Sequence, residues 1–171
     1  MLELGGASGG NLIPFAAHHP EAQCRVIDIS PRQVAEGAAR VAALGLDNIA
    51  IDCASITDLD GGIGTFDYVI AHGVYSWVSA PVREALLRLM GMALAPHGVA
   101  YLSYNVLPGW RVAQPVRDAI RALVPDGLPE ETRLRVARDL LGLASRHAMN
   151  TEAYGQQLRT TCDHLLARSD D

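Results

Sequence analysis

The sequence predicts an α/β protein with a doubly wound, Rossmann-like, mostly parallel sheet of about five strands and helices on both faces. Two patterns carry this prediction. Short apolar runs alternate with amphipathic runs of helical period from Met1 to about Asn105, which is typical of strand–helix–strand units with right-handed crossovers. The expected strands are apolar almost throughout, which predicts a sheet buried on both sides.

The first part of the sheet is predicted from three apolar runs separated by two helices. Strands are expected over Met1 to Leu4, Arg25 to Ile29 and Asn48 to Cys53. A short helix from Asn11 to Ala17 follows the glycine-rich run Gly5 to Gly10. The second helix is expected to begin at Pro31 with Ser30 as its cap, because proline suits the first helical position and a hydroxyl can accept a free backbone N–H. Gly45 supplies its stop.

The second part of the sheet contains a fourth strand, one long helix and a fifth strand. These are expected over Phe66 to Ala71, about Pro81 to Leu94, and Val99 to Tyr104. Pro96-His97-Gly98 predicts a turn between the helix and the last strand.

The character of the chain changes after Trp110. Helical stretches are expected over Val112 to Val124, Pro129 to Ala148 and Thr151 to Arg168, and no strand candidate follows Asn105. We therefore expect a core over residues 1–110 and a helical extension over 111–171, packed on or beside that core.

Composition excludes several classes of protein. The 171 residues carry a formal net charge of −5, and the basic residues are scattered arginines with no lysine, which argues against a nucleic-acid partner. No apolar run reaches the length of about 18 residues that a membrane span needs. The three cysteines are far apart, which argues against a disulfide framework or a cysteine zinc site, and no metal site is expected. A reducing cytoplasm is the expected location.

The fold predicts where a ligand binds, because open parallel sheets bind ligands beyond the carboxyl ends of their strands. Five loops meet at that rim: Gly5 to Asn11, Asp28 to Ser30, Ala54 to Ile56, His72 to Trp77, and Asn105 to Trp110. They gather glycine, histidine, tyrosine and tryptophan residues. We therefore expect the binding site at this rim.

The first two of these loops indicate an adenosine-type ligand. A glycine-dense loop between a strand and a helix lets the backbone approach a ligand closely. Asp28 ends the next strand, where a carboxylate can accept hydrogen bonds from a ribose diol. Two plainer interpretations stay open: the loop is only a tight turn, and Asp28 only helps Ser30 cap the following helix.

Several motifs resemble those of class I S-adenosylmethionine-dependent methyltransferases. Glu3 to Gly9 is similar to the E-x-G-x-G-x-G loop of that family, and Val26 to Gln33 to its second motif with the ribose-binding acid. The strings H-G-V-Y-S-W at 72–77 and S-Y-N-x-x-P-G-W at 103–110 are similar to one subgroup. That subgroup has a methyltransferase regulatory domain and includes bacterial protein-lysine methyltransferases. The resemblance covers roughly Met1 to Trp110.

The resemblance implies S-adenosyl-L-methionine as cofactor. It leaves two classes of methyl acceptor open: a protein, with lysine as the side chain that the subgroup suggests, or a small molecule. It implies the following cofactor-binding residues: Glu3, Gly5, Gly6, Ala7, Gly9, Asn11, Asp28, Ile29, Ser55, Ile56 and His72. It implies these residues for catalysis: His72, Tyr75, Tyr104 and Asn105. Trp77 and Trp110 are expected to wall a channel for an alkyl ammonium group. The oligomeric state is left open.

The sequence also departs from the family pattern. Ala7 replaces the middle glycine, Ser8 replaces an acidic or threonine residue, and Ser55 stands where many relatives place an aspartate against the adenine. The chain also resembles a truncated gene product. A non-catalytic cofactor-binding module therefore stays open as an alternative, and so does a nucleotide-dependent oxidoreductase on fold analogy alone.

The individual site residues have structural alternatives too. His72 can cap its strand, Tyr75 and Trp77 can be core aromatics, and Tyr104-Asn105 can be a plain strand end. Trp110 can be a packing anchor.

Overall fold

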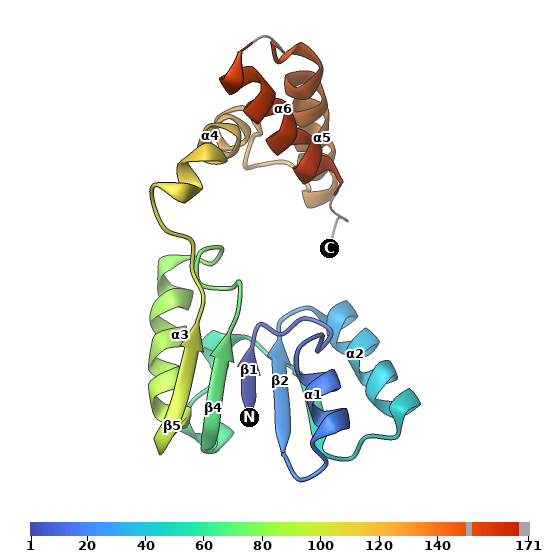
Figure 1. The fold of residues 1–171 in the computed structure, drawn as a ribbon, viewed down its shortest axis with the longest axis vertical. Coiled ribbons are helices and arrows are strands. Elements are labelled where there is room, and N and C mark those ends of the chain that lie inside the picture. Colours follow the sequence, from blue (N-terminus) through green and yellow to red (C-terminus); the bar gives the residue numbers. More distant parts are fainter. Residues whose placement is uncertain (150–151, 168–171) are drawn as a thin grey trace. The chain divides into compact units, whose positions relative to one another are not determined.

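The computed structural model describes residues 1–149 and 152–167, and the chain divides into two compact units, Met1–Tyr104 and Asn105–Asp171 (Figure 1). The division falls after Tyr104, whereas the sequence analysis places it after Trp110. The first unit contains the sheet, and the second contains helices.

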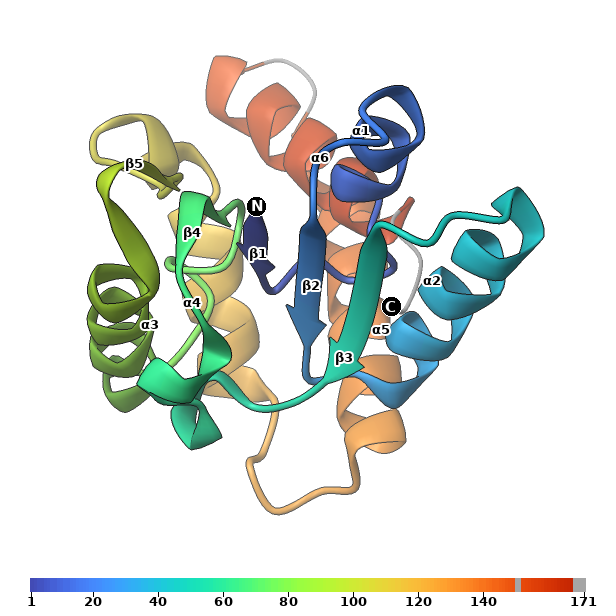
Figure 2. The ribbon, with the colours of Figure 1, turned by 90° about the horizontal axis from the view of Figure 1, so that it is seen from below.

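The first unit is a five-stranded sheet in the order β3-β2-β1-β4-β5, and every neighbouring pair is parallel (Figure 2). Its strands are β1 (Leu2–Leu4), β2 (Cys24–Asp28), β3 (Ile49–Cys53), β4 (Phe66–Ala71) and β5 (Leu94–Leu102). The strand order reverses between β1 and β4, which is the point where such sheets bind ligands. The predicted fold class is therefore confirmed.

Two apolar clusters pack on opposite faces of this sheet. Because side chains alternate along a strand, Val26 and Ile27 of β2 point to different faces, and they belong to different clusters. Val26 packs with α1 (Leu12–His18) and with Val41 of α2 (Pro31–Leu44). Ile27 belongs to the cluster that includes Leu86, Leu89 and Met90 of α3 (Ala80–Ala93). Helices therefore cover both faces, as predicted.

The helix signals in the sequence act as expected in α2. Ser30 Oγ accepts a hydrogen bond from the Gln33 backbone N–H at 3.4 Å, and Pro31 is the first helical residue. Gly45 ends the helix in the left-handed conformation with φ of 63°, which glycine adopts at little cost.

The last strand differs from its prediction in two ways. It runs through the expected Pro96-His97-Gly98 turn, but its register with β4 jumps from Phe66–Leu94 to Tyr68–Val99, so the turn survives as a bulge opposite Asp67. Proline has no N–H for the ladder, which favours this irregularity. Val99 and Tyr101 are 55% and 51% exposed, so the expectation of a sheet buried on both sides holds for β1 and β2 and is wrong for β5.

The second unit contains η3 (Gly109–Val112), α4 (Gln114–Leu123), α5 (Glu130–His147) and α6 (Ala153–Leu166). Its buried centre is formed by Val116, Leu141 and Cys162, one from each long helix. The three predicted helices are present with shorter ends, and among the described residues no strand follows β5. Asn150, Thr151 and Arg168, which the prediction used, lie outside the described residues.

One buried side chain fastens α1 to the sheet. Asn48 is 4% exposed, and its Nδ2 lies 3.1, 3.0 and 3.0 Å from the carbonyl oxygens of Ala16, His19 and Ala22. These carbonyls belong to the end of α1 and the turn after it. Asn48 therefore satisfies carbonyls that the helix itself leaves without a partner.

We expect Asn48→Ala to lower the free energy of unfolding by about 2–3 kcal/mol, because it leaves buried carbonyl oxygens without a donor. Urea denaturation followed by circular dichroism measures this. The control is Asp47→Ala, which changes the exposed neighbouring residue. Equal stability of the two variants would contradict the role assigned to Asn48.

Candidate functional site

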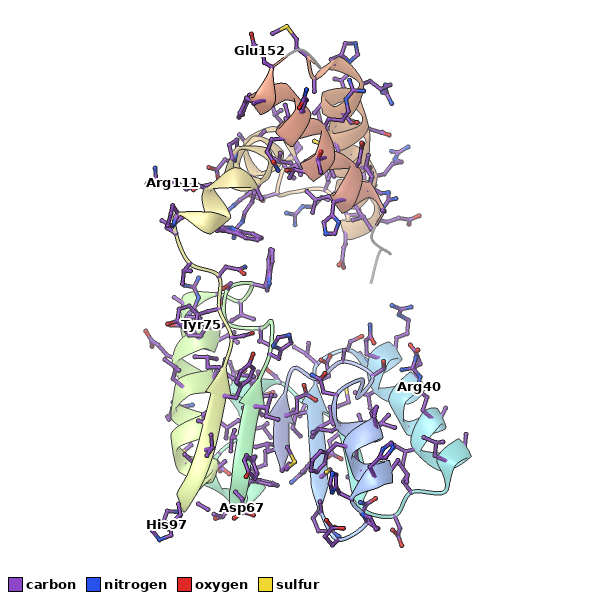
Figure 3. All side chains as sticks on the ribbon, viewed as in Figure 1. Arg40, Asp67, Tyr75, His97, Arg111 and Glu152 are labelled. Atoms are coloured by element: carbon purple, nitrogen blue, oxygen red, sulfur yellow. The ribbon has the colours of Figure 1, made fainter. Side chains whose placement is uncertain are left out.

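A cleft of about 310 Å³ lies at the carboxyl ends of the strands in the first unit. We call it the strand-end cleft. Its lining combines the glycine loop, the ends of β2 and β3 and the segment after β4: Gly5, Ile27, Asp28, Ile29, Ala54, Ser55, Ile56, Val74, Trp77, Val78 and Val82. Figure 3 shows Tyr75 at this rim, whereas Asp67 and His97 lie at the opposite ends of the strands. The cleft is therefore at the rim that the sequence predicts.

The glycine loop is shaped by close backbone approaches. Gly5 has φ of 72°, and a Cβ there would lie 2.4 Å from Val74 Cγ2. A Cβ on Gly6 would lie 2.6 Å from Val26 Cγ1. Since real Cβ atoms do not approach other carbons so closely, both positions need glycine. The loop therefore fits tightly between β2 and the segment after β4.

Ala7 adopts a conformation that is costly for a residue with a side chain. Its φ is 48°, and Ala7 is the only non-glycine residue with a positive φ among the described residues. A left-handed residue with a Cβ costs about 1–2 kcal/mol. Alanine in place of the glycine that the resemblance implies at this position is therefore a source of backbone strain.

Asp28 links the glycine loop to the end of β2. Its Oδ2 accepts a hydrogen bond from the Ala7 backbone N–H at 2.8 Å, and its Oδ1 accepts one from the Ser30 N–H at 2.9 Å. The carboxylate also lines the strand-end cleft. Each carboxylate oxygen has two lone pairs, so each can still accept a hydrogen bond from a ligand. Asp28 thus supports the start of α2, as one interpretation of the sequence expects, and it also lines the cleft.

Glu3 is a buried carboxylate under the glycine loop. It is 2% exposed, its Oε1 accepts a hydrogen bond from Asn11 Nδ2 at 2.6 Å, and its Oε2 is buried with no hydrogen-bond partner among the described residues. A Cβ on Gly6 would lie 3.0 Å from the Glu3 carboxyl carbon. Buried polar oxygens normally have a partner, so this one offers a place for an N–H donor or a cation.

Ile29, Ser55 and Ile56 form the outer side of the cleft with Asp28. Ile29 is 71% exposed at its edge. Ser55 caps the short turn η1 (Ile56–Asp58), and its Oγ lies 2.7 Å from Thr57 Oγ1. The position where relatives have an aspartate is therefore occupied here by a hydroxyl that already has a partner.

The residues implied in catalysis fall into separate groups. Tyr75 and Tyr104 meet edge to face with ring centroids 6.1 Å apart, and Arg83 Cζ lies 5.8 Å from the centre of the Tyr75 ring. His72 follows β4 and does not line the strand-end cleft, whereas Trp77 does. Asn105 and Trp110 belong to the second unit, and their roles at the site stay predictions.

The sequence analysis missed residues that the fold brings to the rim. Val74 and Val78 of the segment after β4 and Val82 of α3 line the cleft, and none of the three carries a polar group that would have indicated this. Tyr101 was also missed: its ring stacks on His72 with centroids 5.9 Å apart.

Other chemistries find no support in the described part of the chain. No group of three or more histidine, cysteine or acidic residues is placed to hold a metal ion there. Burial raises the pKa of the Cys24 and Cys162 thiols, which disfavours the nucleophilic thiolate. None of the described helices combines the length and the apolar character needed to cross a membrane.

Comparisons with known proteins agree with this geometry. The profile of the family described as "Methyltransferase domain" matches residues 2–100. An uncharacterized protein of Rickettsia prowazekii (strain Madrid E) is 48% identical over 172 residues, which are 100% of this chain and 31% of that protein. A second uncharacterized protein of the same organism is 38% identical over 118 residues, 69% of this chain and 47% of that protein.

A solved structure shows the same fold. PKMT2 from Rickettsia typhi, in complex with AdoHcy, has a TM-score of 0.73 and 32% identity, over 99% of this chain and 33% of that one. The chain thus spans about a third of the length of PKMT2. The family match covers more than half of the chain, and the reversal point of the sheet carries the glycine loop and Asp28. The chain therefore belongs to the class I S-adenosylmethionine-dependent methyltransferases.

Proposed function

We propose that this chain binds S-adenosyl-L-methionine in the strand-end cleft and supports methyl transfer to an amine of another protein, with lysine as the acceptor side chain. The observation that carries the proposal is the Asp28 carboxylate, which is hydrogen-bonded to the glycine loop at one side of the cleft. The AdoHcy complex of PKMT2, whose fold this chain shares, supports the same ligand class.

Residues of the cleft, together with Glu3 under the glycine loop, fit the three chemical parts of this cofactor. Asp28 has lone pairs for a ribose diol, and the apolar side chains of Ile29 and Ile56 suit an adenine ring. The unpartnered Oε2 of Glu3 suits the ammonium of the methionine part, because a cation would satisfy its charge and its lone pairs. When bound, the cofactor supplies an electrophilic methyl group on a sulfonium.

The chain's own contribution to the reaction is orientation and exclusion of water. The loop is already shaped by Gly5 against Val74 and by the hydrogen bond from Ala7 to Asp28, so little ordering remains to be done on binding. Well-oriented reactants can gain about 7–11 kcal/mol over reactants that meet by diffusion. Trp77 at the cleft supports a channel for the acceptor, because an indole face attracts an alkyl ammonium group.

The distribution of charge supports a cationic acceptor. Residues 1–104 contain ten acidic residues and five arginines, a net charge of −5, whereas residues 105–171 contain nine of each. The whole net charge of the chain is therefore carried by the unit with the cleft. A field of this sign raises the encounter rate with a lysine-rich protein.

We also propose a cytoplasmic location and a core over residues 1–110 with a helical extension over 111–171. The three cysteines are free, which agrees with a reducing compartment. The subgroup resemblance of the strings at 72–77 and 103–110 supports the inclusion of Trp110 with the core.

A direct test measures S-adenosylmethionine binding by calorimetry and then transfer of labelled methyl groups to a bacterial protein extract. We expect binding, and labelling that is lost when the lysines of the extract are acetylated beforehand. Because the chain has no lysine, labelled lysine after hydrolysis cannot come from the chain itself. Binding without transfer would instead support the non-catalytic module, which the strained Ala7 favours.

We expect Asp28→Ala to weaken S-adenosylmethionine binding by about 100-fold or more, because each hydrogen bond to a charged group contributes about 1.5–3 kcal/mol. Calorimetry measures the affinity, and thermal unfolding without ligand shows whether the loop alone has been disturbed. Asp47→Ala, at an exposed site, is the control. A folded Asp28→Ala protein with unchanged affinity would refute the ribose assignment.

We expect Ala7→Gly to stabilise the chain by about 0.5–1 kcal/mol, since relief of the left-handed strain exceeds the entropy that glycine adds to the unfolded state. Because the hydrogen bond from the backbone N–H of residue 7 to Asp28 does not need the Ala7 side chain, we expect the loop to keep its shape and the affinity for S-adenosylmethionine to change less than threefold, or about 0.6 kcal/mol. Thermal unfolding and calorimetry give the two numbers. A lower free energy of unfolding for the variant would contradict the inference that Ala7 is strained.

A further inference from the structure

A histidine and a tyrosine meet at the carboxyl ends of β4 and β5, outside the lining of the strand-end cleft. Their rings stack with centroids 5.9 Å apart and an interplanar angle of 26°. Tyr101 Oη lies 3.4 Å from His72 Nδ1. This places the hydroxyl and the ring nitrogen at the long end of hydrogen-bond distances.

The backbone on both sides of His72 is fixed by Ser103, the residue after β5. The Ser103 N–H donates to the Ala71 carbonyl at 3.1 Å, and the Gly73 N–H donates to Ser103 Oγ at 2.7 Å. Gly73 has φ of 72°, a left-handed turn that glycine adopts without strain. His72 therefore projects from a segment that Ser103 holds at two points.

The same segment touches the glycine loop. Val74, two residues after His72, lies so close to Gly5 that no Cβ fits between them. Val74 also lines the strand-end cleft with Asp28. The His72–Tyr101 pair is thus joined by two residues of chain to the site where we place the cofactor.

We propose that Tyr101 is a positioning residue for His72, with Tyr101 Oη accepting a hydrogen bond from the His72 Nδ1–H so that Nε2 keeps its lone pair. His72 Nε2 then takes a proton from the acceptor amine. This role of His72 rests on the proposed function, whereas the hydrogen bond itself does not. A partner on one ring nitrogen fixes which of the two neutral tautomers is present.

The proton has to move because an alkyl ammonium nitrogen has no lone pair. The ammonium gives one proton to His72 Nε2, and the freed lone pair forms the nitrogen–carbon bond to the methyl group. The carbon–sulfur bond breaks, and its electron pair stays on sulfur, which becomes neutral. The methylated nitrogen carries the positive charge, and the imidazolium returns its proton to water.

Tyr75 and Tyr104 are less suited to this task. The Tyr75 ring contacts Arg83 and Tyr104. Among the described residues, the ring that stacks on His72 and the hydroxyl that approaches its Nδ1 both belong to Tyr101. Tyr101 is thus the tyrosine whose hydroxyl approaches the imidazole.

The test reads the tautomer of His72 from the ¹⁵N chemical shifts of its ring in alkaline buffer, where the imidazole is neutral. His72→Gln assigns the signal among the six histidines. We expect the Nδ1–H tautomer to dominate, and Tyr101→Phe to reduce its population severalfold. Tyr68→Phe is the matched control, since Tyr68 is also half exposed and lies in β4, four residues before His72.

Equal tautomer populations in the wild-type protein and in Tyr101→Phe would overturn the proposal, and so would a dominant Nε2–H form in the wild type. A second measurement uses methyl transfer to the protein extract. We expect Tyr101→Phe to lower kcat about tenfold with KM for S-adenosylmethionine unchanged. If the wild type binds S-adenosylmethionine and transfers methyl groups but Tyr101→Phe keeps the same kcat, the positioning role of Tyr101 is refuted and the proposed function stands. If the wild type does not bind S-adenosylmethionine, the proposed function alone is refuted.

Discussion

The hydrogen bond from the Ala7 N–H to Asp28 Oδ2 is the contact on which the site depends. It joins the loop after β1 to the end of β2, two segments that are neighbours because the strands are paired in parallel. This hydrogen bond stabilises Ala7 in its strained conformation, with a positive φ of 48°. The same carboxylate supports the start of α2 through the Ser30 N–H. A single side chain thus sets the shape of the loop, the start of a helix and one wall of the cleft.

The other side of the loop is fixed by packing rather than by polar contacts. Val74 fills the space that a side chain on Gly5 would need, and Val74 itself belongs to the segment held by Ser103 through Gly73. The loop is therefore confined between β2 and the segment after β4, by contacts from both directions. The strand-end cleft and the His72–Tyr101 pair thus share the segment from His72 to Val74. A change in the position of this segment is expected to alter both.

Features that depend on the chemistry of single residues could be predicted from the sequence. Ser30, Pro31 and Gly45 mark the ends of α2 because a cap, a fixed φ and a left-handed stop are properties of single residues. The place of Asp28 follows from strand order alone. The bulge in β5 and the role of Tyr101 could not be predicted in the same way. They depend on which residue of β4 lies opposite, and register is a property of the pair of strands.

Glu3 shows most clearly that the first unit is built for a ligand. Its neighbours Leu2 and Leu4 are fully buried against one face of the sheet, and Glu3 points to the other face, where it is 2% exposed. A carboxylate there loses its hydration, and Asn11 compensates only one of its two oxygens. The other oxygen destabilises the free chain by about 1–3 kcal/mol. That free energy is recovered when a cation or N–H donor reaches the oxygen, so the chain is less stable alone but binds such a group more tightly.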